Sequence, residues 1–433
     1  MTSPIPHLDF ERHSLPNGLK IVLHPDRSKP LVAVNLWYHV GSKHESPGKT
    51  GFAHLFEHMC FQGSENVGTT DHFRYVQQVG GVANGSTWFD RTNYYDTLPA
   101  HHLDLGLWLE SDRMGFLLPA VTQENLDNQR SVVMNERRQR MDNVPYGRAG
   151  EALHELLFPG DHPYRWPVIG HMADLEAARL EDVHSFFRRF YTPNNAVLTL
   201  AGDFDPSDAL KRIEDWFGGI PAGEPVPPVA APLTPLGDRR RVIEDDVRLP
   251  RVYIAFRAPS YGQRAWYAGD LLASALAGGK SSRLYRDLVY DRQIAQDVGA
   301  YINPFEESAP FILIASARPG VAIETVEAAV VGHLESAAAE LVPDDQLERA
   351  RNRILTQYYS DLQKLDSRAD LLSQFTTYFD DPGALTRELE AYRDLSREEL
   401  RDFAARYAQE PERVTITFVP RPGQGQGQGD SKA

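Results

Sequence analysis

The sequence contains little cysteine, no long apolar run and fewer basic than acidic residues. A single cysteine, Cys60, excludes a disulfide within the chain and fits a reducing compartment. No stretch reaches the eighteen or so consecutive apolar residues that a membrane span needs. Residues 1–7 contain neither the basic segment nor the apolar segment of a secretory signal. We therefore expect a soluble protein, cytoplasmic as the sequence stands and periplasmic if a signal peptide has been removed.

The charge balance is acidic, with 60 Asp and Glu residues against 45 Lys and Arg residues and a formal net charge of -15. This charge disfavours nonspecific binding to nucleic acids and to anionic membrane surfaces. Hydrophobic residues make up 42% and charged residues 24% of the 433 residues, which is usual for a soluble globular protein of two or more domains.

The most informative segment is His54-Leu55-Phe56-Glu57-His58, which lies in a mostly apolar stretch that predicts a buried helix. Residues four apart lie on the same face of a helix, so His54 and His58 can direct both imidazoles at one metal ion. Glu57 lies beside them, where a carboxylate can hold and deprotonate a metal-bound water. The order His-x-x-Glu-His is the inverted zincin motif of metallopeptidases. The alternative is an amphipathic helix that carries two surface histidines and an acid.

A catalytic zinc ion usually takes three protein ligands, so a further ligand is needed on another element. The run over residues 122–141 predicts a second helix with Thr122 as its cap, and Glu136 lies late in this helix. Glu136 is therefore the candidate third ligand. For the first helix, Thr50 is the expected cap and Gly63 can end it.

These residues resemble the insulinase and pitrilysin family, which includes the mitochondrial processing peptidase and similar bacterial peptidases, because Glu136 fills the slot of the family's third ligand. The resemblance extends from about residue 10 to about residue 420 and includes several further segments. They are the strand segment Gly80–Tyr94, the close of the first domain at Phe190–Ala196 and Ala201–Asp203, and the hallmark of the second domain at Gly278–Tyr285.

The resemblance implies a zinc metalloendopeptidase with one zinc ion per chain, held by His54, His58 and Glu136. Glu57 is then the general base that takes a proton from the zinc-bound water and returns it to the leaving amine. The enclosed chamber of the family implies that the substrates are unfolded peptides or oligopeptides.

Two further residues take a role from the resemblance. Asn84 is expected on the strand that pairs with an extended substrate; the alternative is a turn asparagine before Gly85. Gln129 lies two helical turns before Glu136 on the same face, where many relatives carry a glutamate that supports the metal site. The alternative for Gln129 is plain helix surface.

The family fold implied is α+β, with two structurally repeated α/β domains, each a mixed sheet flanked by helices, that form half of a clam-shell chamber. Proline density places the domain boundary at residues 221–237. Residues 1–220 then form the zinc-bearing domain and residues 238–420 a metal-free repeat that lacks a second His-x-x-Glu-His motif. Residues 421–433 alternate Gly and Gln in part and are expected to be a disordered tail.

Local patterns also predict individual elements. Asn17-Gly18 indicates the turn of a hairpin over residues 10–23. An amphipathic helix is expected over residues 180–190, and the strand over residues 196–201 that closes the first domain is repeated over residues 414–419.

In this family, two subunits or half-molecules, each made of two α/β domains, enclose the chamber. The one without the zinc site commonly supplies an Arg and a Tyr that bind the substrate carbonyl. The corresponding positions here are Val289 and Gln296, which have neither a guanidinium nor a phenol. We therefore predict that this chain is the zinc-bearing member of a heterodimer whose homologous partner supplies the Arg-Tyr pair, with a homodimer as the alternative. The alternative function is that of a non-catalytic structural or peptide-binding subunit of a larger complex.

Overall fold

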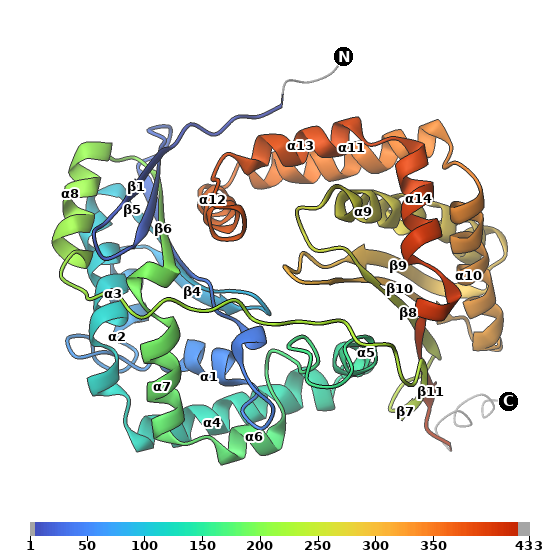
Figure 1. Cartoon of the computed structure of the whole chain (residues 1–433), viewed down its shortest axis with the longest axis horizontal. Coiled ribbons are helices and arrows are strands. Elements are labelled where there is room, and N and C mark those ends of the chain that lie inside the picture. Colours follow the sequence, from blue (N-terminus) through green and yellow to red (C-terminus); the bar gives the residue numbers. More distant parts are fainter. Residues whose placement is uncertain (1–4, 423–433) are drawn as a thin grey trace, which may run out of the picture. The chain divides into compact units, whose positions relative to one another are not determined.

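The computed structural model describes residues 5–422, which form two compact units (Figure 1). The first unit holds the chain up to Arg137, Trp166–Ala231 and Tyr358–Glu388, and the second holds Arg138–Arg165, Pro232–Gln357 and the chain from Leu389. Within residues 5–422, no helix combines the length and the apolar character that crossing a membrane requires.

The first unit is built on a six-stranded mixed sheet with the order β1-β2-β6-β3-β5-β4. Its strands are β1 (Glu11–Ser14), β2 (Lys20–Pro25), β3 (Leu31–Tyr38), β4 (Val82–Thr87), β5 (Thr92–Pro99) and β6 (Ala196–Gly202). The predicted hairpin is confirmed, since β1 and β2 pair antiparallel. Gly18 in its turn has a φ of 88°, a left-handed conformation that glycine adopts without a steric penalty.

Successive side chains of a strand point to opposite faces of a sheet. In the first sheet, apolar side chains lie on both faces. One face packs on α1 (Phe52–Met59), α3 (Leu103–Phe116), α4 (Gln123–Arg137), α7 (Leu180–Phe190) and α8 (Pro206–Phe217), with α2 (Asp71–Gln78) and α6 (Met172–Ala177) beside them. The other face carries Trp37 and Val197, which pack against Leu372 of α12 (Leu365–Phe379). The helix predicted over residues 180–190 is confirmed as α7.

The second unit repeats this topology. Its sheet has the order β7-β11-β8-β10-β9 and contains β7 (Arg240–Asp245), β8 (Arg251–Ala258), β9 (Ala295–Ile302), β10 (Ala309–Ala317) and β11 (Val414–Pro420). The pairing of β7 with β11 is parallel and the others are antiparallel, as in the series β2-β6-β3-β5-β4 of the first unit. Two mixed sheets flanked by helices confirm the predicted α+β class and the predicted repeat.

The helices of the second unit are α5 (Ala149–Leu157), α9 (Arg264–Ala277), α10 (Ile323–Ala339), most of α11 (Asp344–Asp361) and α14 (Arg397–Tyr407). The chain passes from the first unit to the second within α13 (Ala384–Asp394), after residue 388. The units exchange segments along the sequence: α5 packs on β11 and β8, whereas α12 packs on β6 and β3. The two units therefore differ from the predicted contiguous division into residues 1–220 and 238–420. The reason is that each sheet has a second apolar face, and a helix from the other half of the sequence covers this face. The predicted tail lies outside the described residues from residue 423 onward.

Candidate metal centre

Two helices of the first unit bring the three predicted metal ligands together. The Nε2 atom of His58 lies 3.2 Å from Oε2 of Glu136, and the Nε2 atom of His54 lies 3.8 Å from the same oxygen. The two imidazole rings of α1 lie 4.8 Å apart between their centroids. All three side chains are partly buried, and their ligand atoms lie within 4.8 Å of one another. One carboxylate and two imidazoles thus converge.

These distances fit a zinc ion. Two ligands that each lie 2.0–2.1 Å from a tetrahedral zinc ion are separated by about 3.3 Å. The 3.2 and 3.8 Å separations of the two imidazole nitrogens from the Glu136 oxygen are close to that value. Two imidazoles and a carboxylate are also the donor set of several catalytic zinc sites, in which the fourth position stays open.

Glu57 lies on the same helix but outside the group of three. The hydroxyl of Thr87, the last residue of β4, donates a hydrogen bond of 2.5 Å to the Glu57 carboxylate. Burial raises the pKa of Glu57, while the Thr87 hydrogen bond and the charges of His58 and Arg91 act in the opposite direction. The sequence places Thr87 in a strand but gives no sign of this contact, because the two residues meet only when β4 packs beside α1.

Asn84 and Gln129 occupy different surroundings. Asn84 is exposed on β4, the edge strand of the sheet, and its Oδ1 atom accepts the N–H of Gly85 at 2.9 Å. Among residues 5–422, no strand pairs with the outer edge of β4. An unpaired edge of this kind is where an extended peptide can add to a sheet. Gln129 lies on α4 with only 6% of its surface exposed, two turns before Glu136. It is therefore not plain helix surface.

The amino end of α1 is held by a residue that the sequence does not indicate. Thr50, the expected cap, instead donates from its hydroxyl and its N–H to Asp174, at 2.6 and 3.1 Å. The prediction that Thr50 caps the helix is wrong. The Glu45 carboxylate accepts the N–H groups of Gly51 and Ala53 at 2.8 and 2.7 Å, and Gly51 has a φ of 84°. The helix also ends earlier than Gly63, at Met59.

We expect Glu45→Ala to lower the free energy of unfolding by about 1–3 kcal/mol, because two N–H groups of the helix start lose their acceptor. Glu45→Gln keeps one acceptor oxygen and should lose less. Urea unfolding monitored by circular dichroism measures both. Glu348→Ala, at an exposed position of α11, is the control and should change stability by less than about 0.5 kcal/mol. Equal effects at both positions would show that Glu45 does not hold the helix.

A second group of metal-ligand residue types lies in the same unit: His72 on α2, Asp96 on β5 and Glu110 on α3, all buried. The guanidinium of Arg113 lies among them, donating to both oxygens of Glu110 at 3.2 and 3.1 Å and to Nδ1 of His72 at 2.8 Å. Burial lowers the pKa of His72 to about 3, so its imidazole is neutral. Because Arg113 already supplies the cation, this group is an internal ion network rather than a second metal site.

The network predicts a pH-dependent stability. Burial raises the pKa of Asp96 to about 7, so the folded protein keeps a proton that the unfolded chain loses at a pKa near 3.8. The Asp96 contribution to stability is therefore lost as pH rises from about 4 to about 7, whereas neutral His72 acts in the opposite direction below pH 6.5. The substitution Asp96→Asn removes the Asp96 titration, together with the part of the raised pKa of Glu110, about 7 through burial, that comes from the neighbouring Asp96. We expect the free energy of unfolding of Asp96→Asn, relative to that of the wild type, to rise by about 2–3 kcal/mol between pH 5 and pH 8. Urea unfolding measures this difference. A difference that does not vary with pH would contradict a proton held at Asp96.

Comparison with known proteins identifies the class. The family model described as Insulinase (Peptidase family M16) matches residues 20–163, and the model described as Peptidase M16 inactive domain matches residues 177–354. The chain is 28% identical over 418 residues to the zinc protease PqqE of Helicobacter pylori, covering 95% of this chain and 93% of that protein. It is 30% identical over 320 residues to an uncharacterised zinc protease of Mycobacterium leprae, covering 71% of this chain and 69% of that protein.

A solved structure agrees with these matches. The crystal structure of a protease from Helicobacter pylori has a TM-score of 0.89 and 27% identity to this chain, and the match covers 96% of this chain and 100% of that one. The chain therefore belongs to the insulinase family, peptidase family M16.

Proposed function

We propose that this protein is a zinc-dependent endopeptidase that hydrolyses unfolded peptides or oligopeptides. The observation that carries the proposal is the convergence of His54, His58 and Glu136 from two helices, with Glu57 beside them but outside the group of three. Two relatives of this chain, from Helicobacter pylori and Mycobacterium leprae, are named zinc proteases, which supports it.

The mechanism assigns separate tasks to the residues around the site. Zinc, held by His54, His58 and Glu136, would supply a Lewis acid for the scissile carbonyl and lower the pKa of a water. Glu57 takes the proton of the attacking water and passes it to the leaving amine. The hydrogen bond from Thr87 fixes one carboxylate oxygen of Glu57, which leaves the other for proton transfer.

The substrate would lie along β4. An extended peptide that adds to the open edge of a sheet gains backbone hydrogen bonds whatever its sequence, and the pockets for its side chains select among peptides. Asn84 is exposed on this edge strand, which supports a contact between its side chain and such a peptide. This mode of binding requires an extended and hence unfolded substrate.

We further propose that the active form contains a homologous partner subunit that supplies an Arg-Tyr pair. Val289 is buried in η6 (Tyr285–Asp291), and Gln296 lies exposed on β9. Valine has no hydrogen-bond donor in its side chain, and glutamine has an amide but no phenol. We also propose, as the family implies, that the two domains of this chain form half of a clam-shell chamber.

The test is the zinc content and the peptide-cleaving activity of the purified chain. We expect one zinc ion per wild-type chain, and less than one tenth of that content in His58→Ala, which removes a ligand. Weak cleavage by the lone chain that rises when a subunit with the Arg-Tyr pair is added supports the heterodimer. Full activity of the lone chain supports the homodimer instead. A wild-type chain without zinc at saturating metal contradicts the peptidase proposal and favours the non-catalytic subunit.

A further inference from the structure

Arg137 is the last residue of α4 and directly follows the candidate ligand Glu136. Only 8% of its surface is exposed, and its Nη1 atom donates a hydrogen bond of 2.8 Å to the carbonyl of Gly170. We propose that Arg137 is a positioning residue, which holds the last turn of α4, and with it Glu136, at a fixed distance from the two histidines of α1. Its role toward zinc rests on the proposed function, whereas the anchor itself stands on contacts within the first unit.

The last turn of α4 lies where both the unit and the helix type change. Arg137 is the last residue of the first unit, and the segment that follows, the π-helix η4 (Arg138–Asp142), belongs to the second unit. The backbone hydrogen-bond pattern changes there too, since the N–H of Asn143 donates to the carbonyl of Arg138 at 2.8 Å. Helix ends open more readily than helix interiors. Glu136 lies in this turn, so the position of its carboxylate depends on what holds the helix end.

Gly170 connects this anchor to the start of α1. The φ of Gly170 is 78°, and a Cβ atom there would clash with the backbone of Gly51, the residue before α1. A Cβ atom at Gly51 would in turn lie 2.8 Å from the Cα of Gly170, so the two backbones touch. The N–H of His171 also donates to the hydroxyl of Thr50 at 2.9 Å. The residue that accepts from Arg137 is therefore packed against the start of the helix that carries both histidines.

The contact of Arg137 fixes a position and does not neutralise a charge, because its acceptor is a neutral backbone carbonyl. A cation beside a zinc ion repels it, so an effect of charge alone predicts tighter zinc binding when Arg137 is replaced by a neutral residue. Loss of the anchor predicts weaker zinc binding, because Glu136 is no longer held 3.2 Å from His58. The sign of the change therefore distinguishes the two roles.

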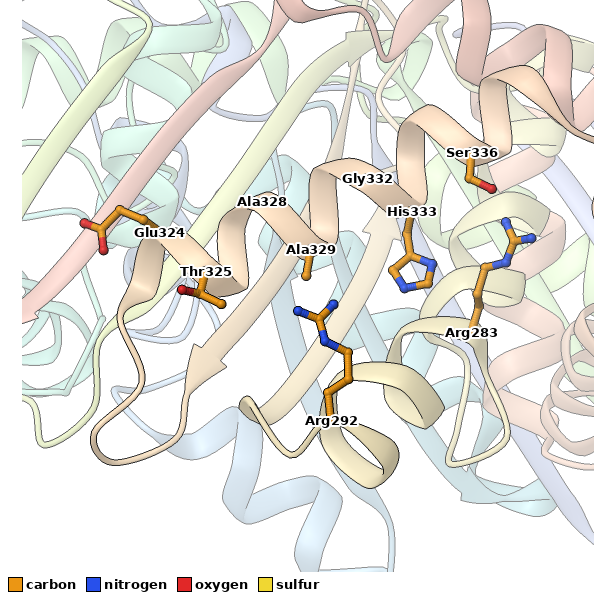
Figure 2. A pocket seen from close by; sticks show the side chains of 9 residues that line it. All are labelled: Arg283, Arg292, Glu324, Thr325, Ala328, Ala329, Gly332, His333 and Ser336. Carbon is orange, nitrogen blue, oxygen red and sulfur yellow. The ribbon is translucent and has the colours of Figure 1, made fainter.

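Zinc bound by the chain can be assigned to the candidate metal centre. Within residues 5–422, metal-ligand residue types form groups of three or more only at this centre and in the network around Arg113. The groove of about 830 Å³ along α10 in the second unit is lined by a single histidine, His333 (Figure 2). This imidazole lies 2.9 Å from the carboxylate of Asp287, which Arg292 also contacts at 3.4 Å, so a cation is already present there.

The experiment measures the zinc dissociation constant of the folded chain by competition with a chelator of known affinity. Arg137→Met removes the donor at similar side-chain length, so the dissociation constant should rise by about 10- to 100-fold. Arg137→Lys keeps the charge but has a shorter side chain that lengthens the contact, so we expect a rise of about threefold or more. Arg351→Met is the matched control, because Arg351 donates to the backbone carbonyls of Tyr392 and Leu395 in the second unit, at 3.0 and 2.8 Å. It should leave the dissociation constant unchanged.

Hydrogen exchange of the protein after removal of metal tests the anchor without zinc. We expect the amides of residues 133–137 to exchange about tenfold faster in Arg137→Met than in the wild type, because the last turn loses a hydrogen bond from a charged group. The proposal is overturned if Arg137→Met binds zinc as tightly as the wild type or more tightly, if Arg351→Met weakens zinc binding equally, or if the exchange of this turn does not change. A wild-type chain without zinc contradicts the proposed function instead, and the exchange result still decides whether Arg137 is the anchor.

Discussion

Replacement of Glu57 by glutamine should reduce the rate of peptide cleavage by about 10²- to 10⁴-fold while the zinc content stays unchanged. Glutamine keeps the size of the side chain and still accepts the hydrogen bond of the Thr87 hydroxyl, which lies 2.5 Å from Glu57. It cannot take a proton from the attacking water. Because Glu57 lies outside the group formed by His54, His58 and Glu136, the metal ligands are not altered.

The measurement combines steady-state cleavage of a fluorogenic peptide with metal analysis of the same sample. Glu181→Gln, at an exposed position of α7, is the control and should keep both the rate and the zinc content. Loss of zinc from the Glu57 variant would identify Glu57 as a ligand. An unchanged rate with zinc retained would place the general base on another residue. The expected result, a low rate with full zinc content, separates proton transfer from metal binding.

The convergence of the three candidate metal ligands could be predicted, because two of them are close together on one helix and the third lies at a spacing known from the family. His54, Glu57 and His58 lie within about one turn of a single helix, so helical geometry alone places them together. Glu136 was added by the resemblance rather than by periodicity, and the structure brings it within 3.2 Å of His58. The topology of the second unit could be predicted in the same way, because its strands repeat those of the first.

The contacts that hold these elements in place could not be predicted, because they depend on how the intervening loop folds or join residues that are far apart in the sequence. Glu45 accepts N–H groups at the start of α1 in place of the expected Thr50. On the outer face of the first sheet, Asp370 of α12 accepts hydrogen bonds from Trp37 and Asn93, at 2.8 and 3.1 Å. Nothing in the local pattern of α12 indicates which sheet it covers. The sequence therefore predicts a contiguous division of the chain and does not predict that the two units exchange helices.

Arg113→Met should be the most destabilising of the substitutions considered, lowering the free energy of unfolding by about 3–5 kcal/mol. The guanidinium is buried and donates to both oxygens of Glu110, which has no exposed surface. It also lies 4.2 and 4.8 Å from the ring centroids of Tyr94 and Phe61. Methionine has a similar length but no charge, so it leaves the Glu110 carboxylate buried without its partner.

Urea unfolding of a double-mutant cycle tests whether this loss comes from the ion pair or from packing. In Arg113→Met with Glu110→Leu, both charges are absent, and the loss should be smaller than the sum of the two single losses by about 2 kcal/mol or more. Arg74→Met on α2 is the control: its guanidinium pairs with Asp71 at 2.9 Å at the surface, so the change should stay within about 1 kcal/mol. Strict additivity in the cycle would mean that packing, not charge, makes Arg113 necessary. Coupling would show that the network joining α2, α3 and β5 depends on the cation, in the same unit as the candidate metal centre.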